Sequence, residues 1–395
     1  MKSALLAVLV AAAFAAAAAD WPVHCLRAQI LGNWTFALGT VAPSFQTIDY
    51  SSCSASAKPA SQLSIALMEP DVAVDSAGTS GFWTLIYDQG IEITLGNKKM
   101  FWFFNYSQQG DKVVSYCDQS LDRQAWFHDV PVIGQPPSNW GCMSALLKSA
   151  SSGAVSSSAP ITSRPSLLRT PQGQQLYAAD HQLCDHINAA QSSWRAAPNP
   201  HFVGKSIADL QRMSGARPFH RPDVPVLPRA QKQPASPRDA AIISSLPRNW
   251  DWRNISGQNF VEPMRDQLTC GSCYAFAGTS MLAERIRILT GNAITPVLSP
   301  QDIVSCSPYS QGCDGGFAYL VSKYGEDFGI ALEQCFPYQS GVLTNVSCAG
   351  RCTDPKQIVH VTRFEYVGGY FGACSEAAMM QEIYSHGPVA VGIEV

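Results

Sequence analysis

The sequence predicts a multidomain protein: an N-terminal antiparallel all-β domain of barrel-like form, a helical intervening segment, and a C-terminal α+β domain. Its 395 residues exceed what one hydrophobic core normally organises. Residues 82–87, 91–95, 100–106 and 113–117 are rich in aromatic and β-branched side chains, which favour strands. Residues 273–289 instead repeat apolar side chains at helical spacing, so the two ends of the chain belong to different kinds of domain.

The predicted β domain covers about residues 20–145. Short turn signals, Asp88-Gln89-Gly90 and Gly96-Asn97, separate its strands. Strands joined so closely form an antiparallel meander, which must close or stack to bury one face. The domain contains four cysteines, Cys25, Cys53, Cys117 and Cys142.

The intervening segment, about residues 146–245, begins with a composition typical of a linker. Residues 144–166 are rich in Ser and Ala, and helices are predicted over 174–195 and 206–213. Prolines then recur between residues 217 and 237, which excludes regular structure and predicts an exposed, extended tether. Such a tether is a preferred site of proteolytic cutting.

The C-terminal domain covers residues 246–395. Its clearest helix, over 273–289, places five residues on one face and stops at Gly291. A shorter helix begins at Ser299, where Pro300 in the first turn and Asp302 predict a variant of the capping box. The residues of the apolar face are Ala275, Thr279, Leu282, Ile286 and Leu289.

Charge and targeting signals limit the functional classes. A net charge of −3 and a pI near 6.2 provide no basic surface for nucleic acid. Residues 1–19 have the form of a cleaved signal peptide, so the mature chain is expected to begin at Asp20, and no later run is long enough to span a membrane.

Thirteen cysteines in a secretory protein predict a disulfide framework with at least one thiol left over. Candidate glycosylation sites are Asn33, Asn105, Asn254 and Asn345.

The residues most informative about chemistry surround Cys273. This cysteine opens the predicted helix, where the positive end of the helix dipole stabilises a thiolate and makes it a better nucleophile. Gln267 can direct its side-chain amide beside the Cys273 backbone N–H, so that both donate to the oxyanion of a tetrahedral intermediate. The alternative is that Cys273 is another disulfide cysteine.

The segment Cys270-Gly271-Ser272-Cys273-Tyr274 resembles the nucleophile signature of the papain family of cysteine peptidases. The resemblance implies that Cys273 is the nucleophile, that Gly315 and Gly316 line the cleft, and that the Gly316 backbone pairs with the substrate chain. Supporting matches are Trp250-Asp251-Trp252-Arg253, Cys306, Cys313-Asp314-Gly315-Gly316 and His386-Gly387-Pro388.

The whole arrangement resembles the dipeptidyl peptidase I (cathepsin C) branch of that family. In that branch the N-terminal β domain, called the exclusion domain, blocks one end of the cleft. In this sequence, residues 146–245 would correspond to the linker and prosegment, and residues 246–395 to an incomplete peptidase domain. The resemblance implies a lysosomal or extracellular precursor that removes dipeptides from free N-termini of peptide and protein substrates and forms a homotetramer. Asp20 would hold the ammonium of the substrate, since both groups are charged at mildly acidic pH. Matching segments include residues 81–87, 188–194, 312–319 and 366–369.

The same resemblance implies a chloride ion bound by Phe317, Tyr319 and Tyr366, and no metal. It also implies five disulfides and leaves Cys184, Cys273 and Cys374 unpaired. The implied pairs are Cys25–Cys117, Cys53–Cys142, Cys270–Cys313, Cys306–Cys348 and Cys335–Cys352.

Such a peptidase also needs a histidine to carry a proton and an asparagine to orient it, about 130 to 150 residues beyond the cysteine. Neither His360 nor His386 is expected to be that base, so the chain as given is expected to lack both residues and to be inactive. The leading hypothesis is part of an active dipeptidyl peptidase. The alternatives are a papain-like endopeptidase and an inactive truncated isoform.

Overall fold

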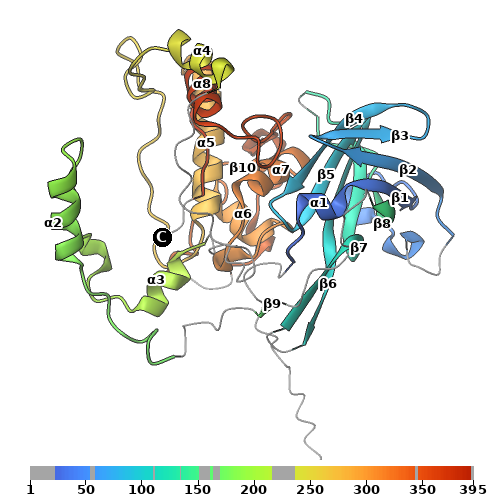
Figure 1. Cartoon of the computed structure of the whole chain (residues 1–395), viewed down its shortest axis with the longest axis horizontal. Helices are drawn as coiled ribbons and strands as arrows, with labels where there is room; N and C mark the ends of the chain where they lie inside the picture. The colour runs from blue at the N-terminus through green and yellow to red at the C-terminus, as the bar shows by residue number, and fades with distance from the viewer. Residues whose placement is uncertain are drawn as a thin grey trace, which may run out of the picture.

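A barrel and a helical domain pack side by side in the computed structural model; of the intervening helices, α2 (His181–Ala190) and α3 (Ile207–Met213) lie on the side of the helical domain away from the barrel, and α4 (Pro237–Ser245) lies beside α8 (Glu376–His386) (Figure 1). The structure describes residues 23–53, 58–109, 112–133, 135–150, 161–162, 170–215, 236–342 and 346–392. The predicted signal peptide, Asp20 and nearly all of the proline-rich tether lie outside these ranges. None of the described helices is both long and apolar enough to cross a bilayer.

The N-terminal domain is a closed antiparallel barrel, as predicted. Its strands hydrogen-bond in the order β6-β5-β4-β3-β2-β1-β8-β7, and β6 also pairs with β7, which closes the sheet. The two-residue strand β9 (Ile161–Thr162) adds to β7. The eight barrel strands are β1 (Gly32–Leu38), β2 (Ser61–Met68), β3 (Val72–Asp75), β4 (Ser80–Ile86), β5 (Gly90–Leu95), β6 (Lys98–Gln109), β7 (Lys112–Asp129) and β8 (Gly141–Ala150).

Large aromatic side chains fill the barrel. Trp34 and Phe36 alternate with outward residues on β1, and the Trp102 ring lies 5.4 Å from each of their rings. All three are fully buried, as the period of two along a strand requires of inward positions. The helix α1 (Arg27–Ile30) packs on the barrel, where Ile30 accepts a hydrogen bond from the Trp34 indole N–H at 2.8 Å.

The predicted linker over residues 144–166 is wrong in its first part. Residues 144–150 belong to β8, which pairs with β1 and β7 and so is part of the closed barrel. Small Ser and Ala residues are poor strand formers, but Met143 and Ala145 are buried whereas Leu146 is exposed. The alternation of burial and the hydrogen bonds of a closed barrel therefore override local composition here.

The disulfide framework matches the expected one. All five implied pairs are bonded, and Cys184, Cys273 and Cys374 are free. Two of the bonds cross-link the barrel and three cross-link the C-terminal domain, so every disulfide lies within one domain. The barrel loops that they close are 92 and 89 residues long, a length at which a cross-link removes about 4 to 5 kcal/mol of chain entropy from the unfolded state.

The described residues of the intervening segment form the helices α2 (His181–Ala190), α3 (Ile207–Met213) and α4 (Pro237–Ser245). The helix predicted over 174–195 is shorter than expected, because Asp180 caps its start and Tyr177 instead donates its backbone N–H to Lys205. The helix at 206–213 is confirmed, with Ser206 as its N-cap. Helix α4 was not predicted, since the prolines before it suggested an extended chain.

The C-terminal domain is mainly helical in the part described. Its elements are α5 (Cys273–Leu289), α6 (Pro300–Cys306), α7 (Ala318–Asp327), α8 (Glu376–His386) and the strand pair β10 (Ile330–Ala331) and β11 (Ile358–Val359). Short 3-10 turns complete the description: Phe45–Thr47, Tyr50–Cys53, Pro200–Phe202, Gly312–Asp314, Cys348–Gly350 and Pro355–Gln357.

Two local predictions in this domain need correction. Helix α5 has the predicted bounds, and Ala275 and Thr279 of the predicted face are buried, but Leu289 is 86% exposed and the buried face also includes Gly278 and Ala283. Small residues there let α7 approach closely, since a Cβ on Gly278 would meet Val321 at 2.7 Å. Ser299 caps α6 through Asp302 N, but the Asp302 carboxylate binds Ala331 and Arg351, so the capping box is only half formed.

A buried cluster of charges joins the barrel to α7. Lys99 on β6 lies 2.7 Å from Glu326 and 3.4 Å from Glu92 of β5. Lys323 of α7, fully buried, lies 3.2 Å from Glu92 and 3.1 Å from Asp327. His128 of β7 contacts Asp327 at 3.1 Å, and Tyr309 and Tyr319 donate to Asp327 and Glu92. We call these side chains the interdomain cluster.

Burial and the neighbouring charges in the interdomain cluster shift the pKa values of its side chains. Burial would lower the pKa of Lys323, but Asp327 and Glu92 reverse the effect and raise it. Burial would likewise raise the pKa of Asp327, but Lys323 and His128 lower it. Burial raises the pKa of Glu326 despite the nearby Lys99. The ammonium groups of Lys99 and Lys323 already contact Glu326 and Asp327, which with His128 are the residues that could hold a divalent cation, and their positive charge disfavours a metal there.

Buried glutamates predict that the protein is most stable at mildly acidic pH. Burial raises the pKa of Glu326, and also of Glu262, Glu284 and Glu333 near α5. Above the ordinary value of 4.5, the unfolded carboxyls lose their protons while the folded ones keep them, so the free energy of unfolding falls as pH rises. We expect the melting temperature to fall in calorimetry as the pH rises above the ordinary carboxyl pKa.

The variant Glu326→Gln should flatten this pH dependence, because it removes one of the titrating carboxyls. Glu365→Gln, an exposed carboxyl, serves as its matched control and should leave the slope unchanged. A melting temperature that rises steadily from pH 5 to pH 8 would contradict the assignment.

Candidate active site

Cys273 is the first residue of α5, with its thiol unpaired and half buried. Ser272 is the N-cap and is fully buried, but its hydroxyl makes no capping bond and lies 2.8 Å from the Tyr338 hydroxyl. The neighbouring bridge from Cys270 to Cys313 ties the approach to the helix against the segment that leads to Gly315. A thiol held at a helix N-terminus is in the position that favours its thiolate.

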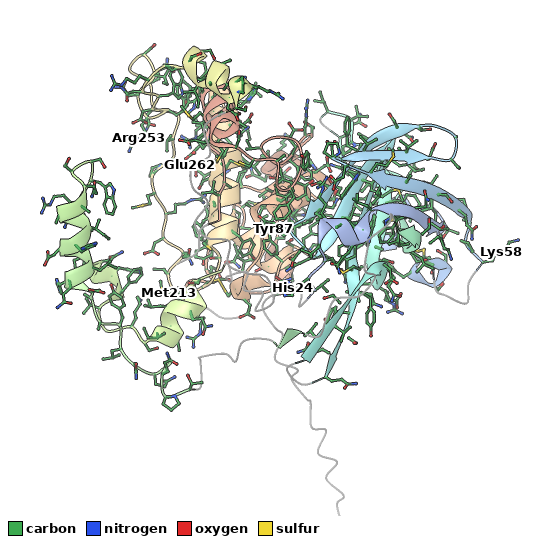
Figure 2. The ribbon with its side chains drawn as sticks, viewed as in Figure 1. His24, Lys58, Tyr87, Met213, Arg253 and Glu262 are labelled. Carbon is green, nitrogen blue, oxygen red and sulfur yellow. A yellow bond between two sulfur atoms is a disulfide. The ribbon has the colours of Figure 1, made fainter. Side chains whose placement is uncertain are left out.

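Gln267 lies at the start of the same loop, and its side chain is already engaged. The amide nitrogen Nε2 donates to the Cys270 carbonyl at 2.8 Å, which fixes the orientation of the amide. Nε2 also donates, at 2.8 Å, to the carbonyl of Met213, the last residue of α3. The Met213 carbonyl, which belongs to the intervening segment, thus accepts a hydrogen bond from the amide that we expected to donate to an oxyanion (Met213 is labelled in Figure 2).

Gly315 and Gly316 lie beside this loop and are buried. Gly315 has φ of 129°, a conformation that favours glycine, and a Cβ on Gly316 would meet the Tyr274 ring at 2.6 Å. The Gly316 N–H donates to the Gly215 carbonyl at 3.3 Å. The chain just after α3 therefore pairs with the backbone position that the sequence assigned to substrate.

Met213 and Gly215 are residues that the sequence interpretation did not assign to the site. A Cβ on Gly215 would collide with the Gly271 carbonyl oxygen and lie 3.1 Å from Cys273 Sγ, so only glycine permits this close approach. Gly215 comes two residues after the end of α3, and the only sequence signal was a glycine after a helix, which usually indicates a C-cap. The intervening segment fills the site of the nucleophile.

The barrel contacts the aromatic residues next to Gly316. Tyr87, in the loop after β4, stacks on Phe317 with ring centroids 3.9 Å apart. Phe317 is the N-cap of α7, and the next helix residues include Tyr319, which stacks on Tyr366 at 4.3 Å. Burial raises the pKa of Tyr87 to about 12, so its phenol stays neutral. Figure 2 shows Tyr87 on the side of the barrel that faces the helical domain.

A cavity of about 460 Å³ opens beside these rings, lined by Tyr87, Tyr319 and Tyr366 together with residues of α5 and α8. The Tyr366 hydroxyl is buried and makes no hydrogen bond of normal geometry to any described residue, and burial keeps its pKa well above the ordinary value. A buried neutral donor of this kind suits an anion. The Tyr319 hydroxyl is committed to Glu92 at 3.0 Å, so of the two phenols only Tyr366 fits the expected chloride through its hydroxyl.

No hydrogen bond joins Cys273 to a histidine within the described part of the chain. His386 is exposed at the end of α8, where Nδ1 lies 3.0 Å from Glu382. His360 follows β11 and lines a second cavity between barrel and helices, and burial lowers its pKa. The structure thus places neither histidine at the nucleophile.

The remaining predicted features are the glycosylation sites, Asp20 and the two other unpaired cysteines. Asn33 and Asn254 are exposed and Asn105 is half buried, whereas Asn345 and Asp20 lie outside the described residues. Cys184 is half buried in α2, and Cys374 is exposed with a pKa that burial raises.

A free thiol at a helix N-terminus, with a fixed amide and a glycine-lined backbone edge beside it, defines the site of a thiol-dependent acyl-transfer enzyme. Comparisons with known proteins agree. Residues 20–146 match the cathepsin C exclusion domain, and residues 246–395 match the papain family of cysteine proteases.

Individual relatives narrow the assignment. Cathepsin C of Schistosoma mansoni is 33% identical over 387 residues, which are 95% of this chain and 76% of that protein. Cathepsin Z of Onchocerca volvulus is 39% identical over 159 residues, 38% of this chain and 51% of that protein. Dipeptidyl aminopeptidase 1 of Plasmodium falciparum is 29% identical over 221 residues, 40% of this chain and 32% of that protein. The chain belongs to the papain family of cysteine peptidases, in the cathepsin C branch that carries an exclusion domain.

Proposed function

We propose that this chain is the precursor of a lysosomal dipeptidyl peptidase, which removes dipeptides from free N-termini through an acyl-enzyme on Cys273. The catalytic histidine and asparagine are then supplied by residues beyond Val395. We use "complete enzyme" for this chain joined to the segment that carries them. The proposal extends to a signal peptide at residues 1–19, glycosylation and passage through the secretory pathway, for which the bonded cysteines are a supporting observation.

The observation that supports an exopeptidase is the contact of the barrel with the residue next to the cleft. Gly316 offers its N–H to an extended chain, and Phe317, the next residue, is covered by Tyr87 of the barrel at 3.9 Å. A groove bordered on that side by a folded domain admits only a short stretch of substrate before the scissile bond. An N-terminal ammonium there needs a carboxylate partner, a role that we assign to Asp20.

Within the site, the residues of this chain perform the acyl transfer. The Cys273 sulfur forms a bond to the substrate carbonyl carbon, and the carbonyl electron pair moves to the oxygen. The Gln267 amide and the Cys273 N–H donate to that oxygen. The carbonyl re-forms as the C–N bond breaks, the histidine that took the thiol proton passes it to the leaving amine, and water then hydrolyses the thioester that remains. A chloride near the Tyr366 hydroxyl would supply a fixed negative charge at the base of the neighbouring pocket.

In the precursor this machinery is blocked. The Gln267 amide is held by Met213, and Gly215 occupies the edge at Gly316 and lies against Cys273. The segment must therefore leave before a substrate can bind. Cutting in residues 216–235, between α3 and α4, is the step that we propose releases it.

The dipeptidyl specificity has a direct test in the complete enzyme after activation. A peptide with a free N-terminus should be cleaved after its second residue, and the same peptide with an acetylated N-terminus should be cleaved about 100-fold more slowly or not at all, because the lost ionic contact is worth roughly 3 kcal/mol in a closed cleft. Asp20→Ala should weaken dipeptide release with little change in Cys273 alkylation. Equal cleavage of the free and acetylated peptides would instead establish the endopeptidase alternative.

A non-catalytic truncated isoform is the second alternative. It predicts a stop codon immediately after the codon for Val395 in the transcript. A transcript that continues into a histidine- and asparagine-bearing segment would exclude it.

A further inference from the structure

The hydroxyl of Tyr338 connects the two ends of the loop that precedes α5. We call residues 267–272 the oxyanion loop, since Gln267 begins it and Cys273 follows it. Tyr338 Oη donates to the Gln267 backbone carbonyl at 2.9 Å and lies 2.8 Å from Ser272 Oγ. The Tyr338 hydroxyl therefore contacts Gln267, whose amide is one proposed oxyanion donor. It also contacts Ser272, which directly precedes the other proposed donor, the Cys273 N–H.

The oxyanion loop needs such a support. Leu268 has φ of 55°, a left-handed conformation that costs a non-glycine residue about 1 kcal/mol or more. Strained backbone of this kind persists only where the surroundings hold it. At the Ser272 end, the hydroxyl is fully buried and makes no capping bond to α5, so Tyr338 is the partner that orients it.

Tyr338 is itself held rigidly. Its backbone N–H donates to Glu333 Oε1 at 2.8 Å, and its ring stands edge-on to Phe276 of α5 at 4.7 Å. Burial raises the pKa of Tyr338, so the phenol keeps the proton that it donates. The same segment contacts the loop again at Gly341, whose carbonyl accepts from Thr269 at 2.8 Å.

We propose that Tyr338 is a positioning residue of the acyl-transfer site, whose hydroxyl holds the Gln267 amide and the Cys273 N–H at the spacing that an oxyanion requires. The proposal rests on the oxyanion role given to these two groups above. Loosening the loop should weaken the binding of the developing negative charge and leave the attack of the thiol on a reagent without a carbonyl unaffected.

The test uses Tyr338→Phe in the complete enzyme, since this change removes the hydroxyl and keeps the ring on Phe276. We expect kcat for dipeptide release to fall about 10- to 100-fold with KM within about twofold, because one well-placed oxyanion donor contributes 10²- to 10³-fold and the donors here are displaced rather than removed. The affinity for a dipeptidyl aldehyde, whose adduct with Cys273 carries the oxyanion, should fall by a similar factor. Alkylation of Cys273 by iodoacetamide should stay within about twofold.

Controls separate positioning from folding. Tyr384→Phe, on exposed α8, should leave all of these quantities unchanged. Ser272→Ala should reproduce part of the kcat loss, and the loss in the double variant should be smaller than the product of the two single losses, because both changes act on one contact. Should Tyr338→Phe fail to fold, Ser272→Ala alone must still lower kcat and aldehyde affinity without slowing alkylation.

An unchanged kcat in Tyr338→Phe would overturn the proposal, and so would a loss of alkylation as large as the loss of kcat, which would show a general distortion of the site. If the enzyme proves to be an endopeptidase, the same comparison is made with an acetylated substrate. Failure of the dipeptidyl specificity is thereby distinguished from failure of the role of Tyr338.

Discussion

The variant Lys99→Met is expected to destabilise the chain by about 3 to 5 kcal/mol, because it removes one partner of a buried charge pair and leaves the other behind. Lys99 Nζ contacts both oxygens of Glu326, at 2.9 and 2.7 Å, and its side chain is only 10% exposed. Glu92 would keep only the ammonium of Lys323, which also contacts Asp327. The measurement is the midpoint of urea unfolding.

Lys98→Met provides a matched control on the same strand. Lys98 is 36% exposed and lies 3.9 Å from Asp129, so its loss should change the free energy of unfolding by less than about 1 kcal/mol. Equal effects of the two substitutions would show that the interdomain cluster does not hold the barrel against α7.

The variant Gly215→Val should expose Cys273 in the precursor. A side chain at residue 215 collides with the Gly271 carbonyl and approaches Cys273 Sγ, so the segment after α3 can no longer occupy the site. Overpacking of this kind costs about 1 to 3 kcal/mol, which corresponds to a roughly 5- to 150-fold faster reaction of Cys273 with iodoacetamide. The rate is measured by peptide mapping, with the exposed Cys374 as the internal reference.

Ser214→Val is the control for this experiment. Ser214 is the adjacent residue and is exposed, so a larger side chain there meets no part of the site. Equal rates in Gly215→Val and the unmodified chain would contradict the placement of the segment against Cys273.

The sequence predicts those parts of the fold that depend on local periodicity. Helix α5 has the bounds that its apolar spacing indicates, and β4 to β7 lie where aromatic and β-branched residues are concentrated. Strand β8 was missed because its Ser and Ala residues have weak strand propensity, and pairing with β1 stabilises it. Long-range hydrogen bonding leaves no trace in local composition.

In the site, too, the features with a local sequence pattern could be predicted and those that depend on long-range contacts could not. The nucleophile and the Gln267 amide follow from a short motif, and the disulfide partners follow from family resemblance. The contacts of Met213 and Gly215 follow from neither, because they join the site to a distant segment that carries no chemical signature; Met213 and Gln267 are 54 residues apart in the chain. The charges of the interdomain cluster also escaped prediction, since Lys and Glu are almost always exposed unless they are paired in three dimensions.

The central claim is that the Cys273 sulfur is the nucleophile of an acyl-transfer reaction. It is tested most directly by trapping the intermediate: the complete enzyme, after activation, is mixed with a dipeptidyl ester, quenched in acid and digested, and the residue that carries the dipeptidyl group is located by mass spectrometry. A thioester on Cys273, absent from Cys273→Ala, is the predicted result. A dipeptidyl group on any other residue, or a Cys273 sulfur found in a disulfide, would contradict the account.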